Sequence, residues 1–231
     1  MIATRMKGSE MTIEVATITN IDLQTSVEEE LLWDPAILPA SIGVSVTEGA
    51  VTLTGTVTQL SGRLAAVRAA KRVKGVRAIA DEIVVNNTGI PGRSDHDVAE
   101  FVEHALQWNT MIPDSVHATL RNGVATLDGT VDWNFERRAA ARVVEYISGV
   151  ESVVNNISLK HMESAENIHH RIVGALRRHA DIDADTVQVT AAGGEVRLDG
   201  SVSSWAEREQ VEAAAWTASG VSTVQNNLII R

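Results

Sequence analysis

Hydrophobic residues recur along the chain with two periods that alternate in a fixed order. In three segments, apolar residues fall four positions apart, which is the spacing of one face of an α-helix. These stripes are Leu23, Val27 and Leu31, then Val98, Val102 and Leu106, then Ile168, Ile172 and Leu176. After each stripe, apolar and polar residues alternate strictly, as in a half-buried β-strand. The alternating runs are centred on Val44, Ala118 and Val189. Each segment is therefore predicted to begin with a helix and then a strand.

A glycine-containing turn and three further elements follow each alternating run. The turns lie at Gly49, Asn122–Gly123 and Gly193–Gly194, and Asn-Gly between alternating runs is a strong hairpin signal. A second alternating strand comes next, followed by an Ala-rich helix over about 60–73, 134–147 and 205–218. The last predicted strands cover Val76–Val85, Val150–Leu159 and Val221–Ile230. The predicted order in each segment is α-β-β-α-β.

Nine glycines indicate that the three segments are copies of one unit. They are spaced six and then twenty residues apart in every copy: Gly49, Gly55 and Gly75; Gly123, Gly129 and Gly149; Gly194, Gly200 and Gly220. We interpret them as structural, because turns and helix ends favour the positive φ that glycine adopts easily. The middle glycine of each set lies on the core face of a strand, where we expect it to let a helix approach closely.

These patterns predict an α+β fold made of three tandem two-layer sandwiches. Each would have a three-stranded mixed sheet with two helices on one face, and the two strands that flank the second helix would be parallel. We place an N-terminal lead-in at 1–20 and the repeats at 21–85, 94–160 and 164–231. Because the linkers are short and a unit of this size buries little surface alone, we expect the units to touch.

The order of elements and the spacing of the glycines resemble the BON domain, which is named after bacterial osmotically inducible and nodulation proteins. Further pieces resemble multi-BON members linked to osmotic stress, namely ELLWDPAI, ALQWNTMIP, VDWNFERRAAA and SWAERE. The resemblance implies a non-enzymatic module that is often associated with phospholipid surfaces, envelope maintenance and osmotic or ionic stress. One type of relative is similar to a potassium sensor, and many relatives are exported.

Composition and charge narrow the classes of function. The 231 residues are 44% hydrophobic and 22% charged, which is ordinary for a soluble domain. A formal net charge of −10 argues against a nucleic-acid partner. The chain has no cysteine, which excludes disulfides and thiolate chemistry, and no catalytic or metal-binding motif stands out. We therefore expect no enzyme activity, metal site or cofactor. The N-terminus lacks the pattern of a signal peptide, so the expected location is cytoplasmic.

The first candidate binding feature is a basic strip on the second helix of the first repeat. It contains six cationic residues and no acidic one: Arg63, Arg68, Lys71, Arg72, Lys74 and Arg77. Charges are screened over about 8 Å at physiological salt, so this strip can meet an anionic membrane despite the negative net charge. The alternative is a solvated face that Glu28, Glu29 and Glu30 of the first helix neutralise.

The second candidate feature is the placement of the few aromatic residues. Trp133, Phe135 and Trp205 lie where the second strand enters the second helix, next to Arg137, Arg138 and Arg208. Tryptophan beside arginine suits an interface with lipid headgroups. The alternative is packing at the helix ends or between repeats.

A polar residue also recurs in the last strand, at Asp81, Asn155 and Asn226, with the parity of the apolar face. A buried polar group needs a partner, so we expect a hydrogen bond to a neighbouring loop, with a shared ion or ligand site as the alternative.

Three hypotheses of function remain open. The first is a stress-linked protein that contacts anionic phospholipid surfaces peripherally through the basic strip and the Trp/Arg positions. The second is a module that responds to a monovalent cation such as potassium. The third is a protein–protein scaffold that uses polar sheet faces or exposed strand edges.

Overall fold

The computed structural model describes residues 19–37, 41–86, 94–160, 168–178, 186–218 and 220–231. Nearly all of the predicted lead-in and most of both linkers lie outside the described residues.

Each repeat contains the elements in the predicted order. The first repeat comprises α1 (Asn20–Trp33), β1 (Ile42–Thr47), β2 (Ala50–Val57), α2 (Leu60–Arg72) and β3 (Ala78–Val85). The second comprises α3 (Asp95–Trp108), β4 (His117–Arg121), β5 (Val124–Asp128), β6 (Thr130–Val131), α4 (Asn134–Glu145), β7 (Ser152–Asn155) and β8 (Ser158–Leu159). The third comprises α5 (Ile168–Leu176), β9 (Val187–Ala192), β10 (Glu195–Val202), α6 (Trp205–Trp216), β11 (Thr223–Asn226) and β12 (Ile229–Ile230).

The first helix of each repeat forms where its apolar stripe predicts it. All nine stripe residues are buried. The Thr19 and Ser94 side chains cap the N-termini of α1 and α3 with capping boxes. Each hydroxyl accepts a hydrogen bond from the backbone N–H of the residue three positions on, and the side chain of that residue accepts one from the backbone N–H of the capping residue. These caps satisfy backbone donors that the first turn would otherwise leave without a partner.

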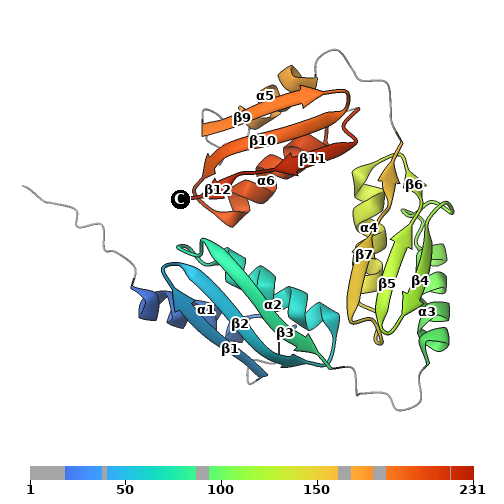
Figure 1. Cartoon of the computed structure of the whole chain (residues 1–231), viewed down its shortest axis with the longest axis horizontal. Coiled ribbons are helices and arrows are strands. Elements are labelled where there is room, and N and C mark those ends of the chain that lie inside the picture. Colours follow the sequence, from blue (N-terminus) through green and yellow to red (C-terminus); the bar gives the residue numbers. More distant parts are fainter. Residues whose placement is uncertain (1–18, 38–40, 87–93, 161–167, 179–185, 219) are drawn as a thin grey trace, which may run out of the picture.

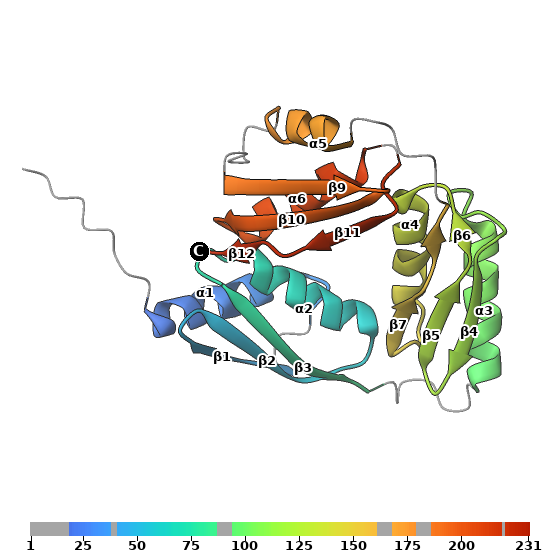
Figure 2. The same ribbon diagram turned by 45° about the horizontal axis from the view of Figure 1, so that its top comes forward.

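The second strand lies in the middle of each sheet. β2 pairs antiparallel with β1 and parallel with β3, so Leu53 faces Val44 on one side and Asp81 on the other. The β5–β6 and β10 segments hold the same central place in the other repeats. Both helices cover one face of each sheet (Figure 2). The α+β class and the two-layer arrangement are therefore confirmed.

The glycine in the middle strand has a different role from the one we expected. A Cβ at Gly55, Gly129 or Gly200 would overlap a backbone carbonyl oxygen one or two positions before the first strand, at Ser41, Ser115 or Thr186 respectively. The three φ angles are +129°, +141° and +126°. The close approach is therefore between two chain segments at the sheet edge, not between the strand and a helix.

The last strand is interrupted in the second and third repeats, where we had predicted one continuous strand. Asn155 ends β7 and Asn226 ends β11. Their Oδ1 atoms accept hydrogen bonds from the backbone N–H of Ile157 (3.1 Å) and Leu228 (3.2 Å). Such a bond does not by itself break the strand, because Asp81 Oδ1 accepts the same bond from the backbone N–H of Ile83 (3.2 Å) while β3 runs without a break from Ala78 to Val85.

The recurring polar residue in the last strand also bonds the second helix, in addition to the bonds from Ile157 and Leu228, which agree with the expected contact to a neighbouring loop. The bonds are Arg63 Nε to Asp81 Oδ2 (2.9 Å), Asn155 Nδ2 to Arg137 O (3.0 Å) and Asn226 Nδ2 to Glu212 Oε2 (2.8 Å). Each side chain thus fastens the last strand to the helix that precedes it.

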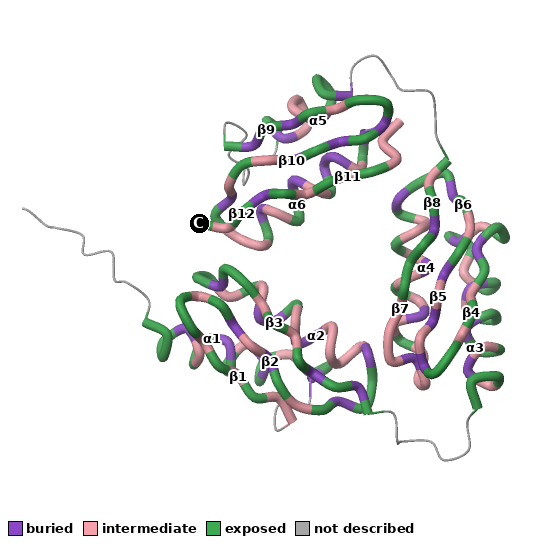
Figure 3. Tube along the Cα trace, in the orientation of Figure 1, coloured by how far each residue is buried: buried purple, intermediate pink, exposed green. Residues whose placement is uncertain are grey.

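The three repeats are arranged so that their second helices, α2, α4 and α6, lie toward the middle of the molecule (Figures 1 and 2). Buried positions alternate with exposed ones along the strands (Figure 3). The buried side chains of the first two repeats form one continuous cluster, against which Trp205 of the third repeat packs. Among the described residues, no helix combines the length and apolar character needed to cross a membrane.

Candidate functional site

Lys71 connects the first repeat to the third. Its Nζ lies 3.0 Å from Glu209 Oε1 and 4.9 Å from the centroid of the Trp205 ring. The guanidinium of Arg208 lies 5.4 Å from the same ring centroid. Two cations from different repeats therefore lie close to the Trp205 ring, which is favourable because an indole ring attracts cations. Of the two alternatives for this tryptophan, packing between repeats is the one observed.

The second repeat also contacts both neighbours. The Arg137 guanidinium lies 4.7 Å from the centroid of the Trp216 ring in α6. On the other side, Gln59 Nε2 donates a hydrogen bond to Ser148 Oγ at 3.1 Å. These contacts confirm the expectation that the repeats touch, and they bring the three second helices around a common space.

That space is a cavity of about 650 Å³, which we call the basic cavity. Six cationic side chains line it: Arg68 and Lys71 from α2, Arg137, Arg138 and Arg142 from α4, and Arg208 from α6. Three carboxylates also line it: Glu145, Glu209 and Glu212. Six positive and three negative charges give its lining a formal charge of +3, in a chain whose net charge is −10.

Two arginines of the predicted basic strip form ion pairs within their own repeat. Arg63 pairs with Asp81 at 2.9 Å. Arg72 pairs with Glu30 at 2.6 Å and with Asp34 at 3.3 Å, and the hydrogen bond to Glu30 raises the pKa of Arg72 above its usual value. The neutralisation that we expected from the first helix thus applies to Arg72, with Asp34 as a second partner.

The other four members of the strip divide into two pairs. Arg68 and Lys71 line the basic cavity. Lys74 and Arg77 are exposed beyond the end of α2 and line neither this cavity nor the cleft described next. The structure therefore joins two of the six residues of the α2 strip to the arginines of α4 and α6, which the sequence placed in separate patches.

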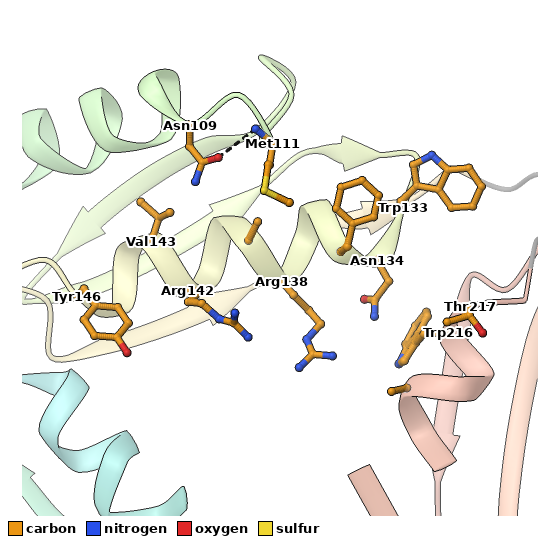
Figure 4. Close-up of a pocket in the computed structure, with 13 residues that line it drawn as sticks. Asn109, Met111, Trp133, Asn134, Arg138, Arg142, Val143, Tyr146, Trp216 and Thr217 are labelled. Atoms are coloured by element: carbon orange, nitrogen blue, oxygen red, sulfur yellow. Dashed lines mark hydrogen bonds between the residues drawn. The ribbon is translucent and has the colours of Figure 1, made fainter. Parts of the chain in front are cut away.

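An apolar cleft of about 860 Å³ adjoins the basic cavity (Figure 4). It runs along α4 and is closed on one side by Trp216, the last residue of α6, and by Thr217, which follows it. Four large hydrophobic side chains that line it are strongly exposed: Met111 (55%), Trp133 (44%), Phe135 (52%) and Tyr146 (61%). Arg138 and Arg142 line both the cleft and the cavity.

Two residues at the junction have distinctive environments. Burial lowers the pKa of Arg137, an effect that Glu212 opposes and Arg138 reinforces. Asn134, the first residue of α4, is only 8% exposed and lines both spaces, yet its Oδ1 has no hydrogen-bond partner among the described residues. In the described part of the chain, no group of three or more His, Asp or Glu side chains is placed to hold a metal ion.

Sequence reasoning missed several residues of this site, among them Arg142, Asn134, Tyr146 and Trp216. Arg142 could have been found, because it follows Arg138 by four positions on the same helix face. Asn134, Tyr146 and Trp216 carry no comparable local signal, since their roles depend on how separate repeats pack.

Comparison with known proteins gives one family. A family model described as BON domain matches residues 21–87, 94–161 and 164–231.

Similar proteins include one curated relative and two solved structures. The osmotically inducible protein Y of Escherichia coli strain K12 is 27% identical over 143 residues, which span 60% of this chain and 71% of that protein. Two structures of CdsD, a structural protein of the type III secretion system of Chlamydia trachomatis, are each 14% identical with a TM-score of 0.26. The matches cover 93% and 91% of this chain, and 100% and 92% of those chains. A TM-score this low carries no structural or functional argument.

Proposed function

The chain belongs to the BON domain family, and from this premise we propose that it is a non-enzymatic, osmotic-stress-associated protein that contacts anionic phospholipid surfaces. The stress association is supported by the similarity to the osmotically inducible protein Y. The lipid contact is supported by one observation: exposed aromatic side chains and two arginines line one cleft along α4, which we call the α4 face.

The α4 face has the composition that a membrane interface favours. Trp133 and Tyr146 have apolar rings with a polar end, which suits the boundary between headgroups and acyl chains. Phe135 and Met111 add purely apolar surface. A group of exposed hydrophobic residues rimmed by polar ones is typical of an interaction site.

Arg138 and Arg142 supply the attraction to an anionic surface. Both are exposed and, among the described residues, neither forms an ion pair. A basic residue near an anionic bilayer contributes about 1 kcal/mol, so this pair contributes about 2 kcal/mol. The negative charge of the whole chain opposes approach only weakly, because charges further than about 8 Å are screened at 150 mM salt.

Co-sedimentation with vesicles tests this proposal. The chain should bind phosphatidylglycerol vesicles, bind phosphatidylcholine vesicles weakly, and lose affinity between about 50 and 150 mM salt. Phe135→Ala should weaken binding about fivefold, because its half-exposed ring can bury only part of the roughly 2 kcal/mol of a full phenylalanine side chain. Arg142→Glu should weaken it further.

Two variants serve as matched controls. Phe101 on α3 is 49% exposed, close to the 52% of Phe135, so Phe101→Ala makes the same change on another face. Arg121→Glu reverses an exposed charge at the end of β4. Failure to bind anionic vesicles would contradict the proposal, and equal losses for Phe101→Ala and Phe135→Ala would contradict the placement of the contact on α4. The cation-responsive and scaffold hypotheses and the cytoplasmic location stay predictions.

A further inference from the structure

The basic cavity holds more positive charge than its own carboxylates neutralise. Glu209 is paired with Lys71, and Glu212 accepts a hydrogen bond from Asn226. Arg68 and Arg138 form no ion pair within the described residues. Like charges gathered around a partly enclosed space repel one another, and an anion in that space would remove the repulsion.

The cations are also of the type that recognises phosphate. Five of the six are arginines, whose planar guanidinium presents a fork of N–H donors that matches the oxygens of phosphate groups. They come from three helices, so their side chains can surround a ligand from several directions. The lowered pKa of Arg137 shows that part of this charge is already desolvated by burial.

Asn134 gives a second, independent indication of a ligand. Its side chain is almost fully buried at the junction of the cavity and the cleft, and its Oδ1 has no partner among the described residues. A buried polar atom without a hydrogen bond is unfavourable by about 1–3 kcal/mol in a protein. A bound, partly protonated phosphate or a water molecule that it orders would supply the missing donor, and the amide NH₂ of the same side chain can donate to a phosphate oxygen.

We propose that the basic cavity between α2, α4 and α6 binds a phosphate-bearing anion, with a diphosphate as the best-matched group. A diphosphate carries about three negative charges at neutral pH, which matches the formal +3 of the lining. The volume of about 650 Å³ lies within the range of small-molecule sites. The proposal does not rest on the vesicle contact, because Arg68, Lys71 and Arg208 line only this cavity while Phe135 and Trp133 line only the cleft.

Isothermal titration calorimetry on the full chain tests this site with two probes that carry the same chemistry. The first is inorganic pyrophosphate, which represents a soluble ligand. The second is a short-chain phosphatidic acid at monomeric concentration, which represents a lipid headgroup. Arg68→Gln removes an exposed cation that has no ion pair in the described structure, so folding should be unaffected. Arg142→Gln is a second cavity variant on another helix, and Arg121→Gln is the matched control outside the cavity.

Pyrophosphate should bind at one site per chain. Each cavity variant should lower the affinity for pyrophosphate about tenfold, because losing a hydrogen bond to a charged group reduces affinity by about that factor. Arg121→Gln should bind as the native chain does. Binding of the phosphatidic acid alone, weakened by the same variants, would support the phosphate site and assign it to a headgroup. Binding of neither probe, or binding that Arg68→Gln and Arg142→Gln leave unchanged, would overturn the proposal.

The membrane contact is distinguished in the same preparations. Arg68→Gln should retain vesicle co-sedimentation, and Phe135→Ala should retain pyrophosphate binding.

Discussion

Replacing Gly200 with alanine should strongly destabilise the third repeat. Gly200 lies in β10 with φ of +126°, a backbone conformation that an L-residue adopts only with strain. A Cβ there would lie well inside the 3.0 Å that real Cβ atoms keep from the carbonyl oxygen of Thr186. The clash is with backbone, so no side-chain rotation can relieve it.

The magnitude follows from two contributions. Backbone strain at such a φ costs about 1–3 kcal/mol, and overpacking that moves the backbone costs about 1–3 kcal/mol more. Together they amount to about 2–6 kcal/mol. A domain of this length is stable by only about 3–10 kcal/mol, so the variant should lose a large part of the stability of this repeat.

Gly174→Ala supplies a control with the opposite sign in the same repeat. Gly174 lies in α5, and the nearest atom to its added Cβ is Arg178 Nη1 at 3.5 Å, which is ordinary contact. Alanine is favoured over glycine within a helix by about 0.8–1 kcal/mol, so this variant should be more stable. Urea unfolding followed by tryptophan fluorescence, with Trp205 and Trp216 as reporters, measures both changes. A Gly200→Ala midpoint equal to that of the native chain would refute the close approach described here.

Three further substitutions test separate parts of the structure. Glu48→Asn should raise the thermal unfolding temperature. Glu48 has φ of +50° at a turn where the second repeat has Asn122 at the same angle, and replacing it with asparagine should relieve about 1 kcal/mol of backbone strain. An unchanged unfolding temperature would contradict this. The hydrogen bond from Arg197 at 2.7 Å holds the pKa of Asp199 below its usual value. The stabilisation from this pair is therefore present above about pH 3.9 and is lost as pH falls through the lowered pKa. Arg197→Gln should raise the Asp199 pKa in an NMR titration, and no rise would show that the pair does not form. Arg208→Gln should destabilise the third repeat by about 2 kcal/mol in urea, since its partly buried guanidinium donates to two carbonyl oxygens of the last strand; a loss below about 0.5 kcal/mol would count against those bonds.

The order of elements within a repeat could be predicted because it depends on local patterns. A few neighbouring residues are enough to predict the helix from its apolar stripe (Leu23, Val27 and Leu31) and the turn from its Asn-Gly pair (Asn122–Gly123). The role of Gly200 was assigned to the wrong neighbour, because periodicity shows which face a residue is on but not which segment packs against it. The breaks at Asn155 and Asn226 could not be predicted from the polar residue itself, because Asp81 at the matching position makes the same backbone bond within a continuous strand.

The candidate site could be predicted only in pieces. The basic residues of α2 and the Trp/Arg positions of α4 and α6 were identified, but as separate surfaces. Lys71 and Glu209 are 138 positions apart in sequence, and no local signal pairs them. The basic cavity exists only because three repeats converge, so its ligand chemistry becomes visible only when the packing of the repeats is known.

The convergence of the second helices is the claim on which the basic cavity depends, and carbodiimide cross-linking tests it most directly. This reagent joins an amine to a carboxylate that is already in contact with it, and the chain has only four lysines. Lys71 and Glu209, 3.0 Å apart in different repeats, should be joined within one chain and be identified by mass spectrometry of the monomer band. Lys160 and Asp132, 2.9 Å apart within the second repeat, provide the positive control. Recovery of the control link without any link between Lys71 and Glu209 would contradict the arrangement.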